Sequence, residues 1–363
     1  MRIFSQRVVT PNACAPAELV VEDGQIIAVE ARSTASPYAH DWGDDLLIPG
    51  LIDIHTDNLE KHYQPRPGAS WDDVGAVMAH DGQCAAAGIT TVFDSLALHG
   101  VRNELNRREA FPAMVAALEL ADAQGLLRAD HLLHLRCEVT SGELLETIAP
   151  QIDNPRLRLL SLMDHRPGQR QMANKAVSVE WQASRPDFDE TLCDTNRQAI
   201  ASLAARRALP LAAHDDATPD HVAEAQALGC TMAEFPVTHA AASAARAAGM
   251  SIAMGAPNFV RGGSHSGNLS ARAAAQADLL DILASDYIPL SMLRSAFMLT
   301  QTPFHWPLPR AMATVSAHPA QATGLVDRGA IAPGLRADLL RIVWQQGQWP
   351  RPLETYVKGQ RIA

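Results

Sequence analysis

The chain has 363 residues, of which 47% are hydrophobic and 19% are charged, a composition typical of a globular protein and not of a disordered one. Acidic residues outnumber basic residues by 40 to 30, and the net charge of −10 argues against the basic surface that nucleic acids and anionic membranes select. The five cysteines form no C-x-x-C pair and predict reduced thiols, and no run approaches the roughly 18 apolar residues of a membrane-spanning helix. We therefore expect a cytoplasmic protein that binds neither nucleic acid nor a membrane, with homo-oligomerisation left open.

Both ends of the chain read as β structure. Residues 1–48 alternate in short strand-like runs on either side of Asp23-Gly24, a dipeptide favoured in two-residue hairpin turns. The last forty residues return to this character in ADLLRIVW and ETYVKGQRIA, which turn residues bound. The sequence predicts a small β-sandwich domain built from residues 1–48 and 325–363.

Residues 49–324 form a different middle, in which short apolar runs alternate with longer Ala-rich segments of helical composition. The runs are LLIPGLIDIH, GITTVFDSL, HLLHLRCEV, LRLLSLMDH, LPLAAH, CTMAEFP, MSIAMGAP and LLDILASDY. Strands that alternate with helices predict parallel βαβ units, and eight of them favour a (β/α)8 TIM barrel, with a doubly wound sheet as the alternative.

Polar residues at the ends of these runs favour the barrel, because the C-terminal ends of its strands converge on one mouth. They are His55 and Asp57, Asp94, Glu138, Asp164 and His165, His214, Glu234 and Asp286. His55 and Asp57 share one face of a strand, since side chains alternate with a period of two. Such a pair alone is weak evidence, but ionisable groups from several strands are costly to bury unless they are paired or bind a cation.

The polar strand ends therefore predict a metal centre. The expected ligands are His55, Asp57, Glu138, His165 and His214, with Glu234 less securely placed. Mixed nitrogen and oxygen ligands suit Zn²⁺, with Mn²⁺, Fe²⁺ and Ni²⁺ as alternatives, and one or two ions per chain. Asp286, on the last strand, is expected to accept a proton from metal-bound water. The alternative role for Asp286 is the N-cap of a helix over IPLSMLRSAF.

A second informative stretch is NFVRGGSHSGNLS, residues 258–270, which follows the seventh predicted strand. Its glycines allow close backbone approach, and Arg261, Ser264 and His265 supply donors, so the loop predicts a phosphate site, with a flexible polar loop as the alternative. Lys61 and Arg166 are weaker candidates for the same anion. Six other histidines have no compelling spacing and are expected to be hydrogen-bonded structural residues: His80, His99, His131, His134, His239 and His318.

Together these blocks resemble the metal-dependent amidohydrolase superfamily. Within it they are similar to the PhnM family of the carbon–phosphorus lyase pathway, chiefly in HTDNLEKHYQPRPGASW (55–71), HDGQCAAAGITTVFDSL (80–96), MDHRPGQRQ (163–171), MGAPNFVRGGSHSGN (254–268) and LASDY (283–287). Asp57 and Glu234 stand where the broader superfamily commonly has histidine, which leaves the number of ions and the role of each ligand open.

The resemblance implies a diphosphatase that hydrolyses α-D-ribose 1-methylphosphonate 5-triphosphate to the 5-phosphate and pyrophosphate in phosphonate catabolism. The substrate would be a small phosphorylated ribose. One alternative is an amidohydrolase or deaminase acting on a cyclic amide or nucleobase, which needs the metal but not the arginine-bearing loop. A second alternative is a non-catalytic scaffold, against which the retention of His55, Asp57, His214 and Asp286 argues.

Overall fold

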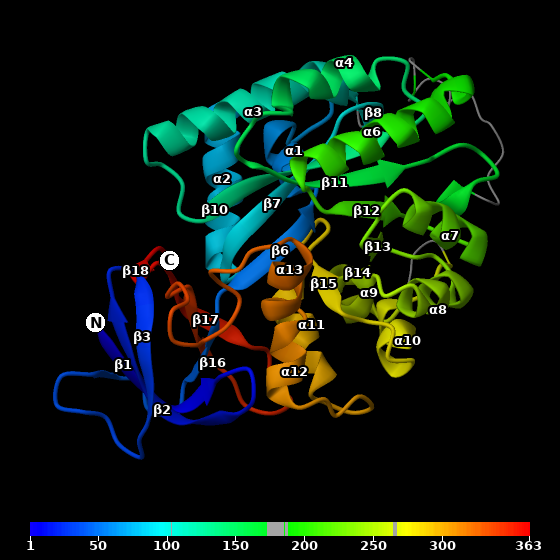
Figure 1. The fold of residues 1–363 in the computed structure, drawn as a ribbon. Coiled ribbons are helices and arrows are strands. Elements are labelled where there is room, and N and C mark those ends of the chain that lie inside the picture. Colours follow the sequence, from blue (N-terminus) through cyan, green and yellow to red (C-terminus); the bar gives the residue numbers. More distant parts are fainter. Residues whose placement is uncertain (103, 173–184, 186–187, 264–266) are drawn as a thin grey trace.

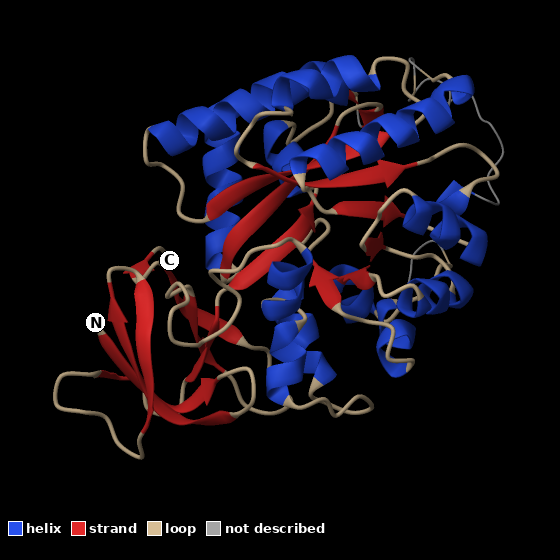
Figure 2. Cartoon of the chain, viewed as in Figure 1, coloured by secondary structure: helices blue, strands red, loops and turns tan. Residues whose placement is uncertain are grey.

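The computed structural model describes residues 1–102, 104–172, 185, 188–263 and 267–363 (Figures 1 and 2). Strands from both termini form one sheet in the order β18-β17-β16-β5-β1-β2-β3, with β4 beside β1. They are β1 (Arg2–Val9), β2 (Cys14–Glu22), β3 (Gln25–Ala31), β4 (His40–Asp41), β5 (Leu46–Pro49), β16 (Leu339–Val343), β17 (Arg351–Val357) and β18 (Gln360–Arg361).

This terminal sheet curls back on itself. The backbone N–H of Ile26 in β3 donates to the carbonyl of Leu335, which shortly precedes β16, at 2.8 Å. Since β3 is at one end of the strand order and β16 is near the other, this contact brings the two ends of the sheet together. The curl encloses a separate hydrophobic core to which Leu19, Leu47 and Leu339 contribute, each fully buried. The first and last parts of the chain thus build one β unit, as the sequence predicted, and both termini lie in it (Figure 1).

The middle of the chain forms eight parallel strands whose order in space follows their order in sequence. They are β6 (Leu51–Thr56), β7 (Ile89–Ala97), β10 (Asp130–Glu138), β11 (Leu157–Met163), β12 (Leu211–His214), β13 (Met232–Glu234), β14 (Ser251–Gly255) and β15 (Ile282–Ala284). Just beyond β15, the Asp286 N–H donates to the His55 carbonyl at 2.9 Å, and the Asp57 N–H donates to the Asp286 carbonyl at 2.6 Å. The first and last strands therefore meet, and the predicted barrel is confirmed over the doubly wound sheet.

The apolar run from Leu46 to His55 holds two strands and not one, because β5 belongs to the terminal sheet and β6 to the barrel. Gly50 lies between them. A Cβ atom at this position would lie 2.4 Å from the Thr90 Oγ1, so only glycine lets the chain pass from one sheet to the other.

Helices cover the outside of the barrel (Figure 2). They are α1 (Asn58–Tyr63), α2 (Asp73–Ala86), α3 (Arg107–Ala123), α4 (Leu144–Ile148), α6 (Cys193–Arg207), α7 (Pro219–Ala227), α8 (His239–Ala247), α9 (Ala256–Arg261), α10 (Ala271–Gln276), α11 (Ser291–Leu299), α12 (Leu308–Ala313) and α13 (Ala317–Ala322). The hairpin of β8 (Val101–Arg102) and β9 (Leu105–Asn106) follows β7. No helix in the described part of the chain is long and apolar enough to cross a membrane.

The barrel interior is filled by apolar side chains, among them Ile52, Phe93, Leu159 and Met232, all 1% exposed or less. A filled interior leaves the C-terminal ends of the strands as the place where a ligand can bind. Helix α11 begins at Ser291 with Leu290 at its N-cap, so the alternative role of Asp286 as a helix cap is wrong.

Candidate active site

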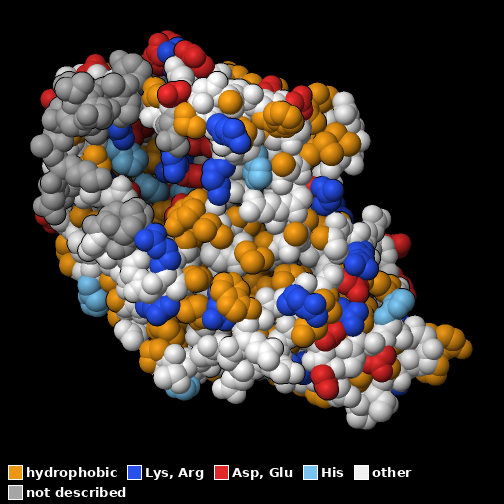
Figure 3. All heavy atoms as spheres, turned by 180° about the vertical axis from the view of Figure 1, so that it is seen from behind, with side chains coloured by type: hydrophobic (Ala, Val, Ile, Leu, Met, Phe, Trp, Pro, Cys, Tyr) orange, Lys and Arg blue, Asp and Glu red, His pale blue; other side chains and the backbone are white. Residues whose placement is uncertain are grey.

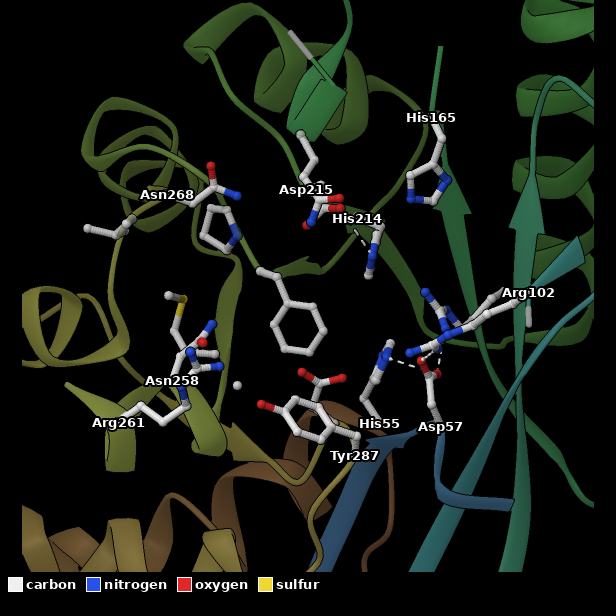
Figure 4. Close-up of a pocket in the computed structure, with 18 residues that line it drawn as sticks. His55, Asp57, Arg102, His165, His214, Asp215, Asn258, Arg261, Asn268 and Tyr287 are labelled. Carbon is white, nitrogen blue, oxygen red and sulfur yellow. Dashed lines mark hydrogen bonds and ion pairs between the residues drawn. The ribbon is translucent and has the colours of Figure 1, made fainter. Parts of the chain in front are cut away.

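A cavity of about 480 Å³ opens at the C-terminal ends of the barrel strands. Histidine and arginine or lysine side chains gather around a hollow in the space-filling view (Figure 3), and the lining residues point into the cavity in the close-up (Figure 4). The lining includes His55, Asp57, Arg102, Arg136, His165, His214, Asp215, Asn258, Arg261, Asn268, Asp286 and Tyr287. They come from strands, loops and helix α9, spread over more than 230 residues of sequence, as expected at a barrel mouth.

At the centre of the mouth, Glu234 joins two imidazole rings. Its Oε1 lies 2.7 Å from His55 Nδ1, and its Oε2 lies 2.7 Å from His214 Nδ1. The two rings are nearly parallel, with centroids 5.8 Å apart. Burial disfavours the Glu234 carboxylate, but the neighbouring histidines outweigh it and hold its pKa well below its usual range. Glu234 thus stays ionised although it is fully buried.

A second group shares His214 with the first. His165, His214 and Asp215 offer ligand atoms that all lie within 4.8 Å of one another. Asp215 Oδ2 lies 3.3 Å from His214 Nε2 and, within the described residues, makes no hydrogen bond. His165 also contacts Glu138, since its Nδ1 lies 2.6 Å from Glu138 Oε2. The mouth therefore holds a continuous chain of imidazole and carboxylate groups.

This donor set fits the expected divalent cation. A buried carboxylate oxygen without a hydrogen-bond partner costs free energy unless something else satisfies it, and Asp215 Oδ2 is such an atom within the described residues. Imidazole nitrogens and carboxylate oxygens together suit Zn²⁺ and similar ions. The structure brings five of the six ligands expected from the sequence, namely His55, Glu138, His165, His214 and Glu234, into this chain of groups.

Asp57, the sixth expected ligand, lies beside them but is held by two arginines. Its Oδ1 accepts from Arg136 Nη1 at 2.6 Å, its Oδ2 accepts from Arg102 Nη1 at 2.9 Å, and His55 Nε2 lies 3.8 Å from Oδ1. Burial opposes ionisation, but Arg136 and its neighbours lower the pKa of Asp57. Sequence reasoning missed both arginines. Arg136 could have been found, because it lies two residues before Glu138 on the same face of β10, whereas Arg102 carries no such signal.

Three residues at the mouth adopt left-handed backbone conformations, with φ of 61° at Asp215, 57° at Phe235 and 56° at Asp286. Their N–H groups still donate to the neighbouring strands, for example from Asp215 to the Glu234 carbonyl at 2.9 Å. The chain therefore turns at once after each strand, and these residues border the cavity. Non-glycine residues in this region are uncommon and cluster at functional sites. Asp215 was missed because an extended chain would place the residue after His214 on the opposite face.

Asp286 lines the cavity at the seam between the first and last strands. Burial raises its pKa, and the negative charge of Asp57 adds to the effect. A carboxyl group with a raised pKa is a stronger base when ionised, which suits the expected role of proton acceptor. That role stays a prediction.

Among the expected substrate-binding residues, Arg261 lines the cavity near Asn258, Asn268 and Tyr287. Ser264 and His265 lie outside the described residues. Lys61 Nζ donates to the Tyr287 carbonyl. Arg166 forms a two-pronged ion pair with Asp164, at 2.9 and 2.8 Å, and is not among the residues that line the cavity.

Two of the polar strand ends do not reach the mouth. Asp94 lies within β7, and its carboxylate contacts His80 of α2 and His131 at 2.8 Å each. Asp164 lies at the end of β11, but its Oδ2 accepts from Arg197 of α6 at 2.5 Å as well as from Arg166. Asp94 was expected at the mouth because it lies in a strand-like run. It turns to the helices because its neighbour Phe93 fills the barrel interior.

Comparison with known proteins adds the family. The chain is 41% identical to the alpha-D-ribose 1-methylphosphonate 5-triphosphate diphosphatase of Escherichia coli (strain K12), over 96% of this chain and 99% of that protein. The chain belongs to this diphosphatase family. It is also 36% identical to an allantoinase of Streptomyces avermitilis, but over only 25% of this chain. No protein-family model matches the sequence.

Solved structures of other enzymes have a similar fold. N-acetyl-D-glucosamine-6-phosphate deacetylase from Mycobacterium smegmatis superposes with a TM-score of 0.69 at 17% identity, over 100% of both chains. The 5-methylcytosine deaminase from Klebsiella pneumoniae, in complex with phosphonocytosine, gives 0.69 at 16% identity, over 100% of this chain and 98% of that one. At such low identity these structures show the fold alone, and they agree with the barrel and its terminal sheet.

Proposed function

We propose that the protein is a metal-dependent hydrolase that converts α-D-ribose 1-methylphosphonate 5-triphosphate to the 5-phosphate and pyrophosphate. The observation that carries this proposal is the 41% identity with the Escherichia coli diphosphatase over nearly the whole of both chains. The mouth supports it, because arginine side chains and a histidine–carboxylate centre border one cavity. We place the reaction in the cytoplasm, where the five free cysteines stay reduced.

The metal would be held by His55, Asp57, Glu138, His165 and His214, with Glu234 and Asp215 as further ligands. We propose Zn²⁺, with Mn²⁺, Fe²⁺ or Ni²⁺ as alternatives, and one or two ions per chain. A bound divalent cation supplies positive charge that polarises phosphoryl oxygens and makes a water molecule more acidic. Glu234 orients two of these ligands, since it accepts hydrogen bonds from both His55 and His214.

In the proposed reaction the anhydride bond between the α and β phosphorus atoms breaks. Water provides the oxygen that one phosphorus gains, the bridging oxygen stays with the other, and Asp286 accepts the proton that the attacking water loses. Arg136 and Arg102 stabilise the negative charge that develops on the phosphoryl oxygens. Arg261 and the amide groups of Asn258 and Asn268 hold the substrate in position.

Phosphorus NMR of a reaction with metal-loaded protein tests the proposal directly. Pyrophosphate and the 5-phosphate should appear together and at equal rates. Sequential release of orthophosphate, or no cleavage of any triphosphate, would contradict the proposal. The partial similarity to an allantoinase makes cyclic-amide hydrolysis the second candidate, so allantoin and hydantoin serve as comparison substrates.

A further inference from the structure

A second cavity of about 260 Å³ adjoins the first. Four guanidinium groups line it, those of Arg102, Arg107, Arg136 and Arg185, and we refer to it as the arginine lobe. Figure 4 shows Arg261, Asn258 and Asn268 on the side of the larger cavity away from Asp57 and Arg102, with Tyr287 extending toward them, and we refer to these four residues as the amide lobe. Both cavities are bordered by Asp57, Arg102, Arg136 and His165. Two of the candidate metal ligands, Asp57 and His165, thus lie where the two lobes meet.

Positive charge is concentrated in the arginine lobe. Its lining contains four arginines and two carboxylates, Asp57 and Glu138. One of these, Asp57, is shared between Arg102 and Arg136, and the other, Glu138, already contacts His165 at 2.6 Å. Arg107 has a partner of its own, Glu60, at 2.9 Å. Among the described residues, four guanidinium groups thus border this one cavity, and guanidinium groups are the side chains that bind phosphate oxygens through paired hydrogen bonds.

The amide lobe has the opposite character. Of the residues that define it, Arg261 is the one cation, and the others offer neutral amide and hydroxyl groups. Such groups suit sugar hydroxyls, for which they can act as both donors and acceptors. One guanidinium is sufficient for a single phosphonate group. The cavity that contains this lobe is also the larger of the two, at about 480 Å³ against about 260 Å³, which suits the larger half of a substrate, a sugar that carries two substituents.

We infer that the arginine lobe binds the β and γ phosphates, which leave as pyrophosphate, and that the amide lobe binds the ribose and its 1-methylphosphonate. This assignment rests on the proposed function. It places the α–β anhydride bond at the junction of the lobes, beside Asp57 and His165. It also revises the expectation from the sequence that the 261–268 loop holds the polyphosphate, because the described part of that loop provides one guanidinium and the arginine lobe provides four.

The decisive experiment compares Arg185→Ala with Arg261→Ala, one from each lobe, neither of which bonds to Asp57. Binding of inorganic pyrophosphate to metal-loaded protein is measured by titration calorimetry. Because the loss of a hydrogen bond to a charged group costs about 1.5–3 kcal/mol, Arg185→Ala should bind pyrophosphate about tenfold more weakly, or weaker still. Arg261→Ala should change the affinity for pyrophosphate by less than about twofold. Metal content and thermal unfolding show that both variants are folded, and Arg107→Gln gives a second variant of the arginine lobe. The reverse order, equal losses, or no pyrophosphate binding by the parent protein would overturn the assignment.

A substrate pair tests the other lobe. For ribose 5-triphosphate with and without the 1-methylphosphonate, Arg261→Ala should abolish most of the difference in kcat/KM, whereas Arg185→Ala should lower both values by the same factor. If the parent protein cleaves the triphosphate but the two variants exchange these effects, the assignment fails and the function stands. If the parent protein cleaves no triphosphate, both fail.

Discussion

Two separate clusters of histidines and carboxylates in the described part of the chain, one at the barrel mouth and one outside the barrel, differ in how far their polar atoms are satisfied. The mouth cluster consists of His55, His214 and Glu234. The outer cluster consists of His80, Asp94 and His131, and it lies outside the barrel strands, between β7, β10 and helix α2. Both groups could hold a metal by residue type and spacing, and every one of these residues is at most 5% exposed. Residue type and burial alone therefore do not separate them.

The ring nitrogens of the outer cluster all have hydrogen-bonding partners within the protein. Asp94 contacts His80 Nε2 and His131 Nδ1 at 2.8 Å each, and Asn58 lies 3.0 Å from the remaining nitrogen of His80. His131 Nε2 lies 3.4 Å from Asp81, so every ring nitrogen has a partner. Burial opposes the charge on His131, but Asp94 and Asp81 overcome it and raise its pKa to about 9. His80 and His131 are hydrogen-bonded structural residues, as the sequence predicted.

The mouth cluster borders a cavity, and its neighbour Asp215 has a carboxylate oxygen with no hydrogen-bond partner in the described chain. The comparison teaches that a ligand site is distinguished by polar atoms that protein groups leave unsatisfied beside open space. Four changes would break or sharpen this distinction.

The largest expected effect is that of the double variant His55→Ala/His214→Ala. It should lose bound metal on dialysis and lower turnover of the triphosphate by about a thousandfold or more, because the cation stabilises transition-state charge by several kcal/mol. Metal analysis and kinetics provide the measurement, with His131→Gln as the control that keeps its metal. Full metal content in the double variant would remove the mouth cluster as the metal centre.

Asp94→Asn should lower the free energy of unfolding and leave the metal content unchanged. Removal of a charge from a buried pair leaves its partner uncompensated, so we expect a loss of about 3 kcal/mol in the free energy of unfolding. Urea denaturation measures it, and Asp286→Asn is the matched control, an Asp-to-Asn change at the mouth. If Asp94→Asn instead lost its metal while the midpoint of unfolding stayed in place, the outer cluster would be a binding site.

Asp286→Asn should lower kcat by about a hundredfold or more, the usual contribution of a general base. The metal content of the variant should stay close to that of the parent protein. Steady-state kinetics and metal analysis on the same sample test both statements, and an unaltered kcat would exclude Asp286 as the proton acceptor.

The smallest effect is the pH dependence that His131 confers on stability. The pKa of His131 in the folded protein, about 9, exceeds its ordinary value of about 6.5. The protonated His131 therefore contributes its full stabilisation of the fold below pH 6.5, and this contribution is lost as the pH rises through 9. The slope in that window is up to about 1.4 kcal/mol per pH unit. Unfolding free energies of the parent and His131→Gln proteins at several alkaline pH values should differ in slope, and parallel curves would contradict the charged state of His131.

Much of the fold follows from local pattern. Each of the eight apolar runs contains a barrel strand, because alternating strand and helix segments have few other ways to bury their apolar faces. The pattern did not separate β5 from β6, since the transition depends on the contact between Gly50 and Thr90, which lies in another strand.

The site was only partly predictable. His55, His214 and Glu234 end strands, and strand ends converge in a barrel, so their meeting could be expected from the sequence. Asp215 depends on a left-handed turn, and Arg102 reaches Asp57 from a hairpin 45 residues further along the chain. Neither feature leaves a periodic signal. Arg166 shows a further limit of such reasoning, because a cation close to a strand end can pair with an adjacent carboxylate, as Arg166 does with Asp164.

The seam between β6 and β15 determines when the barrel can close during synthesis on the ribosome. Asp286 exchanges backbone hydrogen bonds with His55 and Asp57, partners about 230 positions earlier in the chain. A nascent chain that has emerged only as far as β14 still lacks Asp286, the proposed proton acceptor, and the strand that closes the ring. Contacts between segments so distant in sequence form late in folding. The ring of barrel strands therefore closes only after residue 286 has been synthesised, and the terminal sheet is completed later still, by β16, β17 and β18.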